Sequence, residues 1–221
     1  AAMAMMAAIA GFAPARGAEA AEATLIRDTW GVPHAMGDTE PAAFFALGYA
    51  QAEDRLADIY TAIRTATGRL AEVQGDSVLE QDYLMRVSGN DRIHAEYLKT
   101  APPHLQANVA AFTDGIKAYI ADHPDEAADI AVDVEPWHPL AIGRAMILRW
   151  PIGTIMGDLR NEEERARPAA GSNQWAVSPA RTADGSAILL SDPHLTWEGL
   201  AVLYEARLHA GELHACGYYL I

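Results

Sequence analysis

The apolar pattern changes from helical to strand-like at one place, and this change constrains the fold more than any other feature. Before residue 160, apolar residues recur every three or four positions, which is typical of amphipathic helices. After residue 171, short apolar runs alternate with turn residues, as in β-hairpins. The intervening stretch "RNEEERARPAA" has no apolar face at either period, which predicts an exposed linker. The sequence therefore predicts an α+β chain that is helical first and β-rich afterwards.

Two long helices are predicted after a short strand and turn over residues 24–35. The first begins after Thr39, which can cap it, and Pro41 suits its first turn. The second follows Pro102-Pro103 and ends before Pro124, because a residue that precedes proline disfavours the helical conformation. Their apolar faces consist of Phe45, Tyr49, Ala52, Leu56, Ile59 and Ile63, and of Leu105, Val109, Phe112, Ile116 and Tyr119.

A third helix and two β-hairpins are predicted in the rest of the chain. The helix covers about residues 139–150 and ends at Pro151, because proline lacks an amide proton and clashes with the preceding turn. After the linker, "WAVSPAR" and "SAILLS" flank Asp184-Gly185, a pair that is common in hairpin turns. A second turn is expected at residues 209–212, between two further strand-like runs.

Composition and charge exclude several classes of function. The chain has 221 residues, of which 51% are hydrophobic, and this is enough to build a core in one or two domains. A net charge of −14 argues against a nucleic-acid partner, because binding to nucleic acid needs a basic surface. No apolar run after the first twenty residues is long enough to span a bilayer. These features fit a small-molecule or neutral partner.

The first twenty residues differ in kind from the rest of the chain. A short apolar stretch and a proline precede Ala18-Glu19-Ala20, a pattern that is typical of a secretory signal and its cleavage site. The absence of an initiator Met and of a basic segment indicates that the true start is missing. The alternative is a low-complexity, alanine-rich tail. The pattern favours export, which predicts a periplasmic or secreted protein.

The Gly171-Ser172 bond lies where the pattern changes, and it carries the main functional hypothesis. A serine hydroxyl is a poor nucleophile without a base. If this bond is broken, Ser172 gains an α-amine with a pKa near ~8, and one residue then supplies both nucleophile and base. Gly171 suits such a cut because a residue without Cβ tolerates a strained backbone. The alternative is that Gly-Ser is an ordinary loop dipeptide.

Few other residues suggest chemistry. The sequence has no GxGxxG, no phosphate-binding loop, no HExxH and no CxxC pair. His209, His214 and the single cysteine, Cys216, are close in sequence and could be metal ligands. They lie on a predicted hairpin, where His214 and Cys216 share a face, but a third ligand is not evident.

Five motifs taken together resemble the penicillin acylase family of N-terminal-nucleophile hydrolases. They occur in the family's order: "GVPHA" at 31–35, "GYAQAEDRL" at 48–56, "GRLAEVQG" at 68–75, "GSNQWAVSP" at 171–179 and "LLSDPHLTW" at 189–197. The last two look most like the branch that contains cephalosporin (glutaryl) acylases and acyl-homoserine-lactone or lipopeptide acylases. The resemblance implies an exported precursor that cuts itself before a serine. The products are a mostly helical α chain and a β chain, joined as a heterodimer in an αββα sandwich.

The resemblance also implies roles for individual residues. Ser172 is the first residue of the β chain and the nucleophile, and His194 lies near it and takes part in self-cleavage and catalysis. Asn173 helps to hold Ser172. The alternative for His194 is a structural histidine. The chemistry requires no cofactor, but the family implies a structural calcium ion. The α-chain acid that binds it is expected to be one of Glu162, Glu163 and Glu164, and the spacing does not determine which.

On this interpretation the chain has four parts. They are a signal remnant at 1–20, a helical α-chain region at 21–160, a linker or spacer at 161–171, and the incomplete start of the β chain at 172–221. The expected activity is hydrolysis of an acyl amide: the side-chain amide of a β-lactam, an acyl-homoserine lactone or a lipopeptide.

Two further expectations accompany this interpretation. The family's β chain is much longer than the stretch that follows residue 171 here, so we expect the oxyanion hole beyond Ile221 and little activity from this stretch alone. The alternative function is a non-catalytic, exported interaction module of helices and strands that retains the family motifs.

Overall fold

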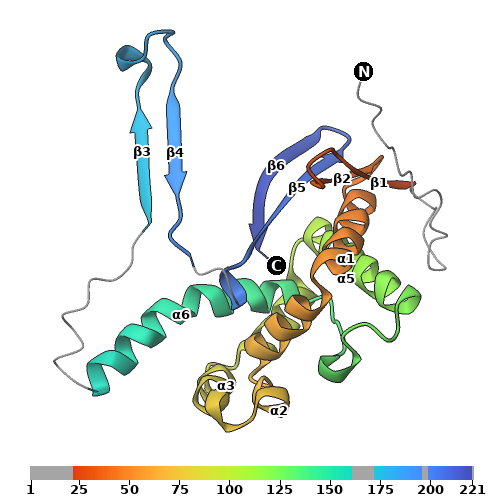
Figure 1. The fold of residues 1–221 in the computed structure, drawn as a ribbon, viewed down its shortest axis with the longest axis vertical. Helices are drawn as coiled ribbons and strands as arrows, with labels where there is room; N and C mark the ends of the chain where they lie inside the picture. Colours follow the sequence, from red (N-terminus) through yellow and green to blue (C-terminus); the bar gives the residue numbers. More distant parts are fainter. Residues whose placement is uncertain (1–21, 161–171, 196–198, 221) are drawn as a thin grey trace.

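A computed structural model of the protein describes residues 22–160, 172–195 and 199–220. The predicted signal remnant and linker, together with Gly171 and the candidate calcium ligands, lie outside the described residues. Helices form most of the first part of the chain and strands most of the last part (Figure 1). The predicted α+β class is therefore confirmed.

The helices form the body of the molecule. The two longest predicted helices are present as α1 (Glu40–Thr67) and α5 (Pro103–Asp122), which pack against each other. Thr39 caps α1 by accepting a hydrogen bond from the amide of Ala42, as its position predicted. The other helices are α2 (Ala71–Gln74), α3 (Leu79–Val87), α4 (Asn90–Thr100) and α6 (His138–Arg160), with single 3₁₀ turns at Asp76–Val78, Ala128–Ile130, Pro179–Arg181 and Gly199–Ala201.

Two glycines allow α1 and α5 to approach closely. A Cβ atom at Gly48 would overlap the carbonyl oxygen of Phe112, and one at Gly115 would overlap the carbonyl oxygen of Phe45. Backbone atoms cannot move out of the way as a flexible side chain can. Both positions therefore require glycine for the observed packing, which buries Ile116.

Helix α6 continues through Pro151, so the prediction that it ends there was wrong. A proline leaves the carbonyl of the residue four positions earlier, here Ile147, without its helical hydrogen bond. Ile147 and Pro151 are both exposed, so water can satisfy that carbonyl. The cost of the proline is thus limited to this one backbone hydrogen bond, and the helix continues to Arg160.

A four-stranded sheet joins the two parts of the chain that flank Ser172. It has the order β1 (Ala23–Arg27), β2 (Pro33–Gly37), β5 (Leu203–Ala210) and β6 (Leu213–Leu220). The central pair, β2 and β5, is parallel, and the outer pairs are antiparallel. One face packs on α1 (Figure 1). Ala206 and Leu208 on β5 are buried. The turn between β5 and β6 lies at Gly211-Glu212, as predicted.

A cluster of polar side chains also links the two parts. The guanidinium of Arg27 on β1 donates to the carboxylates of Glu53 and Asp54 on α1. The hydroxyl of Tyr204 on β5 donates to the same Asp54 carboxylate at 2.6 Å. Burial of the hydroxyl is the main cause that raises the pKa of Tyr204, and the neighbouring Asp54 carboxylate raises it further. The cluster fixes β5 to α1.

The strands β3 (Asn173–Val177) and β4 (Ile188–Asp192) form a separate antiparallel hairpin. It stands apart from the helices and from the other sheet (Figure 1). The predicted hairpin is thus present, but its connection covers residues 178–187 rather than Asp184-Gly185 alone. Both faces of the hairpin are exposed, including Trp175 at 67% and Leu189 at 69%.

Candidate active site

Ser172 lies directly before β3, and His194 follows the end of β4. The two strands pair so that Asn173 is opposite Asp192, which brings the start of one strand to the end of the other. The hydroxyl oxygen of Ser172 accepts a hydrogen bond from the backbone amide of His194, with an N to O distance of 3.3 Å. The structure therefore brings together three predicted site residues, Ser172, Asn173 and His194.

The imidazole of His194 faces the β3–β4 hairpin rather than the serine hydroxyl. Its Nε2 lies 2.9 Å from Oδ2 of Asp192 and 3.3 Å from Nδ2 of Asn173. The Asn173 amide donates to the same Asp192 oxygen at 3.2 Å. The contact between His194 and Ser172 is thus made through the main chain of the histidine.

Asp192 is a site residue that the sequence reasoning missed. Its carboxylate accepts hydrogen bonds from His194 and from Asn173. Both bonds lower the pKa of Asp192, and the bond from His194 has the larger effect. The side chains of Asp192 and His194 are about half exposed, at 50% and 47%. The available signal was the spacing in "SDPH": a carboxylate two residues before a histidine, at the end of a predicted strand, can turn toward that histidine.

This arrangement suits a serine that becomes a chain terminus. The backbone amide of His194 donates to Ser172 Oγ and so orients the hydroxyl. The proton of the hydroxyl stays free to be transferred to a base. In an unbroken chain the nitrogen of Ser172 belongs to a peptide bond and cannot act as that base. An α-amine at the same position could take the proton directly or through one water molecule.

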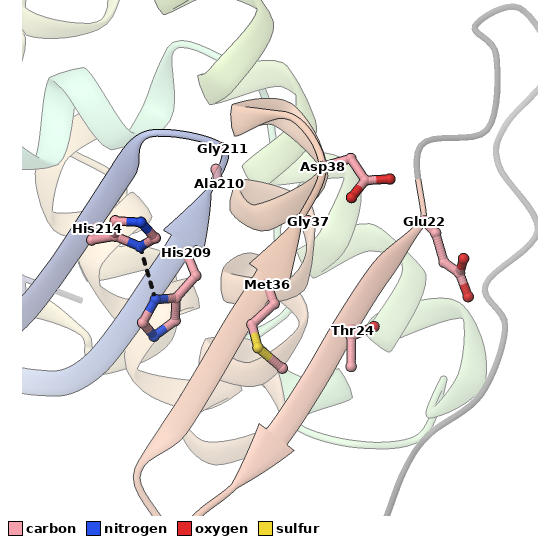
Figure 2. Close-up of a pocket in the computed structure, with 9 residues that line it drawn as sticks. All are labelled: Glu22, Thr24, Met36, Gly37, Asp38, His209, Ala210, Gly211 and His214. Carbon is pink, nitrogen blue, oxygen red and sulfur yellow. Dashed lines mark hydrogen bonds between the residues drawn. The ribbon is translucent and has the colours of Figure 1, made fainter.

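A pocket of about 310 Å³ lies elsewhere, on the outer face of the four-stranded sheet (Figure 2). It is lined by Glu22, Thr24, Met36, Gly37, Asp38, His209, Ala210, Gly211 and His214. His209 and His214 face each other across β5 and β6, with their Nδ1 atoms 3.2 Å apart. Ser172, Asn173 and His194 are not among the lining residues, so the pocket is separate from the serine site.

The structure does not combine His209, His214 and Cys216 into a metal site. Among residues 22–160, 172–195 and 199–220, no group of three or more His, Cys, Asp or Glu side chains could hold a metal ion. His209 and His214 contact each other, while Cys216 is an exposed, free cysteine farther along β6. Within the same described residues, every helix is too short or too polar to cross a membrane.

The fold is similar to that of a solved acylase. The thermostable penicillin G acylase from Alcaligenes faecalis matches with a TM-score of 0.50 and 21% identity, over 67% of this chain and 89% of that chain. This neighbour has the N-terminal-nucleophile hydrolase fold. The predicted fold class is therefore confirmed.

The family follows from the sequence comparison. Residues 22–221 match the family model of penicillin amidase, and the chain belongs to this family. It is 27% identical to penicillin acylase 2 proenzyme of Pseudomonas sp. (strain SE83), over 78% of this chain and 30% of that protein. It is 24% identical to the acyl-homoserine lactone acylase QuiP of Pseudomonas aeruginosa, over 86% of this chain and 30% of that protein. The chain thus spans about a third of the length of these relatives, which are acylases.

Proposed function

We propose that this chain carries the nucleophile region of a self-processing acylase in which Ser172 is both the site of the cut and the catalytic nucleophile. The observation that carries the proposal is the placement of Ser172 directly before β3, with its hydroxyl held by the amide of His194. The relation to a penicillin acylase proenzyme supports it, because a proenzyme is made as a precursor.

The proposed maturation step breaks the bond between Gly171 and Ser172. The Ser172 hydroxyl adds to the carbonyl of Gly171, its proton passes to the departing nitrogen, and an ester forms in place of the amide. Water then hydrolyses the ester, which frees the carboxylate of Gly171 and leaves Ser172 with an α-amine and an intact hydroxyl. The same oxygen is then available for the second reaction.

Turnover repeats this chemistry on an external amide. The α-amine takes the hydroxyl proton, the Ser172 oxygen attacks the acyl carbon, and the amine product leaves with that proton. Water releases the acid from the acyl-enzyme. The substrate class we propose is an acyl amide such as the side-chain amide of a β-lactam, an acyl-homoserine lactone or a lipopeptide. The relatives named for penicillin and for acyl-homoserine lactones support the first two.

The two products of the cut are proposed to remain together as an exported heterodimer. Residues up to 160 would belong to the α chain, and residues from Ser172 onward to the β chain. The parallel pairing of β2 with β5 supports this proposal, because it links the two chains by backbone hydrogen bonds. The hydrogen bond from Tyr204 to Asp54 supports it as well.

The test is to express the full-length protein as wild type, as Ser172→Ala and as Ser191→Ala. Ser191 is an exposed serine on β4 of the same hairpin and serves as the matched control. We expect two chains and release of a chromophore from acyl anilides for wild type and for Ser191→Ala. For Ser172→Ala we expect one chain and no release. An uncut wild-type protein without turnover would instead favour the non-catalytic interaction module.

A further inference from the structure

We infer that Asp192 is a positioning residue for the proposed reaction. Its carboxylate fixes the imidazole of His194 and the amide of Asn173, and through them the backbone amide of His194 that donates to the Ser172 hydroxyl. This inference rests on the proposed function of Ser172. It concerns a residue that neither the sequence motifs nor the family comparison singled out.

The Asp192 carboxylate is the point where the polar contacts of the site converge. One oxygen, Oδ2, receives both the Nε2 of His194 at 2.9 Å and the Nδ2 of Asn173 at 3.2 Å. Asn173 and Asp192 are also directly opposite each other in the strand register, so the backbone holds the two side chains at this distance. Hydrogen bonds to a charged acceptor are roughly twice as strong as neutral ones.

The geometry determines which nitrogen of His194 carries a proton. An unprotonated Nε2 would direct its lone pair at the carboxylate oxygen 2.9 Å away, which is repulsive, so Nε2 must be a donor. Nε2 then cannot accept from Asn173, whose amide donates to Asp192 instead. In the neutral imidazole, Nδ1 is consequently the unprotonated nitrogen and the one able to accept a proton.

Asp192 also acts on Ser172 through the main chain. Only Pro193 separates Asp192 from His194, and the proline ring restricts its backbone to a narrow range of φ. The bond between the Asp192 and His194 side chains closes this short segment into a ring. The backbone amide of His194, which donates to Ser172 Oγ, is part of that ring. Loss of the carboxylate would therefore release both the imidazole and the amide donor.

The experiment compares Asp192→Asn with Asp184→Asn in the full-length protein. Asp184 lies in the loop of the same hairpin and contacts Ser186, so the control removes one exposed carboxylate away from the site. We expect Asp192→Asn to slow both self-cleavage and kcat by roughly ten- to a hundredfold, at or below the lower end of the range for losing a general base outright, with KM unchanged. Asp184→Asn should match wild type in both rates.

A second readout separates positioning from simple structural damage. In Ser172→Ala protein labelled with ¹⁵N-histidine, NMR should show the Nε2-protonated form of His194, and the additional Asp192→Asn change should give a mixture of the two tautomers. Turnover is measured per active site, counted with an acylating inhibitor, and self-cleavage is measured as the first-order rate constant of the precursor that does cut, so that a smaller folded fraction does not count as a slower reaction. Asp192→Glu keeps the charge and should recover part of the lost rate.

The outcomes distinguish this inference from the proposed function. Wild-type rates per site in Asp192→Asn, or an equal loss in Asp192→Asn and Asp192→Glu, would overturn the role of Asp192 while leaving Ser172 as the nucleophile. A wild-type protein that neither cuts at Ser172 nor turns over would overturn the proposed function, and the inference about Asp192 with it.

Discussion

Lowering the pH from 7 to 5 is expected to destabilise the helical part of the protein through His138. This residue starts α6 and is only 5% exposed. Its Nδ1 accepts a hydrogen bond from the amide of Glu135 at 2.9 Å, which requires an unprotonated Nδ1. Burial, aided by the positive charges of Lys117 and Arg69, lowers the pKa of His138 from 6.5 to about 4.

The direction and size of the effect follow from this difference in pKa. Because the folded pKa lies below the unfolded one, the unfolded chain binds the proton more readily between pH 6.5 and pH 4. The free energy of unfolding is therefore unaffected above pH 6.5 and decreases as the pH falls through this window. The expected loss is about 2 kcal/mol at pH 5 and about 3 kcal/mol once the folded state is also protonated.

The assay is urea unfolding at pH 7 and pH 5, on full-length protein kept as one chain by Ser172→Ala. His138→Gln replaces the imidazole with a side chain that still accepts a hydrogen bond but does not titrate, so we expect it to remove about 2 kcal/mol of the pH dependence. His104→Gln, at an exposed position near the start of α5, is the matched control and should behave like the parent. Equal pH dependence in the parent and in His138→Gln would refute the reasoning.

Three further substitutions test the packing and the site. Gly115→Ala should lower the free energy of unfolding by about 1–3 kcal/mol in a thermal unfolding assay, because the added methyl group forces α1 and α5 apart. Gly143→Ala is the control: a Cβ there meets no atom within 4 Å, so the same assay should show no change or a small gain in stability. Tyr204→Phe should weaken the association of the two chains by about 1–2 kcal/mol through the lost bond to Asp54, measured by urea-induced dissociation; unchanged dissociation would contradict this. His194→Ala should slow self-cleavage more than it lowers thermal stability, and normal processing would return His194 to a structural role.

The long elements could be predicted from the sequence because local signals determine them. The apolar face of α1 and its Thr39 cap gave its position, and the turn residues between β5 and β6 gave the hairpin. Helices α3 and α4 were not predicted, because they bury few apolar side chains. Asn90, at the start of α4, is buried and donates to the carbonyls of Ala66 and Ala141. Such long-range contacts leave no periodic pattern in the sequence.

The site could be predicted only in part. The motifs indicated that Ser172 and His194 lie close together, and the structure places them in contact through the histidine backbone. The part played by Asp192 depends on the register that sets Asn173 opposite it, and the sequence does not specify that register. The pocket beside His209 also depends on strands that lie far apart in the chain.

The most direct test of the central claim is the N-terminal sequence and intact mass of each chain in the purified full-length protein. If Ser172 makes the cut, the wild type contains a second chain that begins Ser172-Asn173-Gln174, and Ser172→Ala is a single uncut chain. The proposed chemistry places the new terminus at the hydroxyl that performs the cut, so no other starting residue fits. Active wild-type protein with an intact Gly171-Ser172 bond, or a second chain that begins at another residue, would contradict the account.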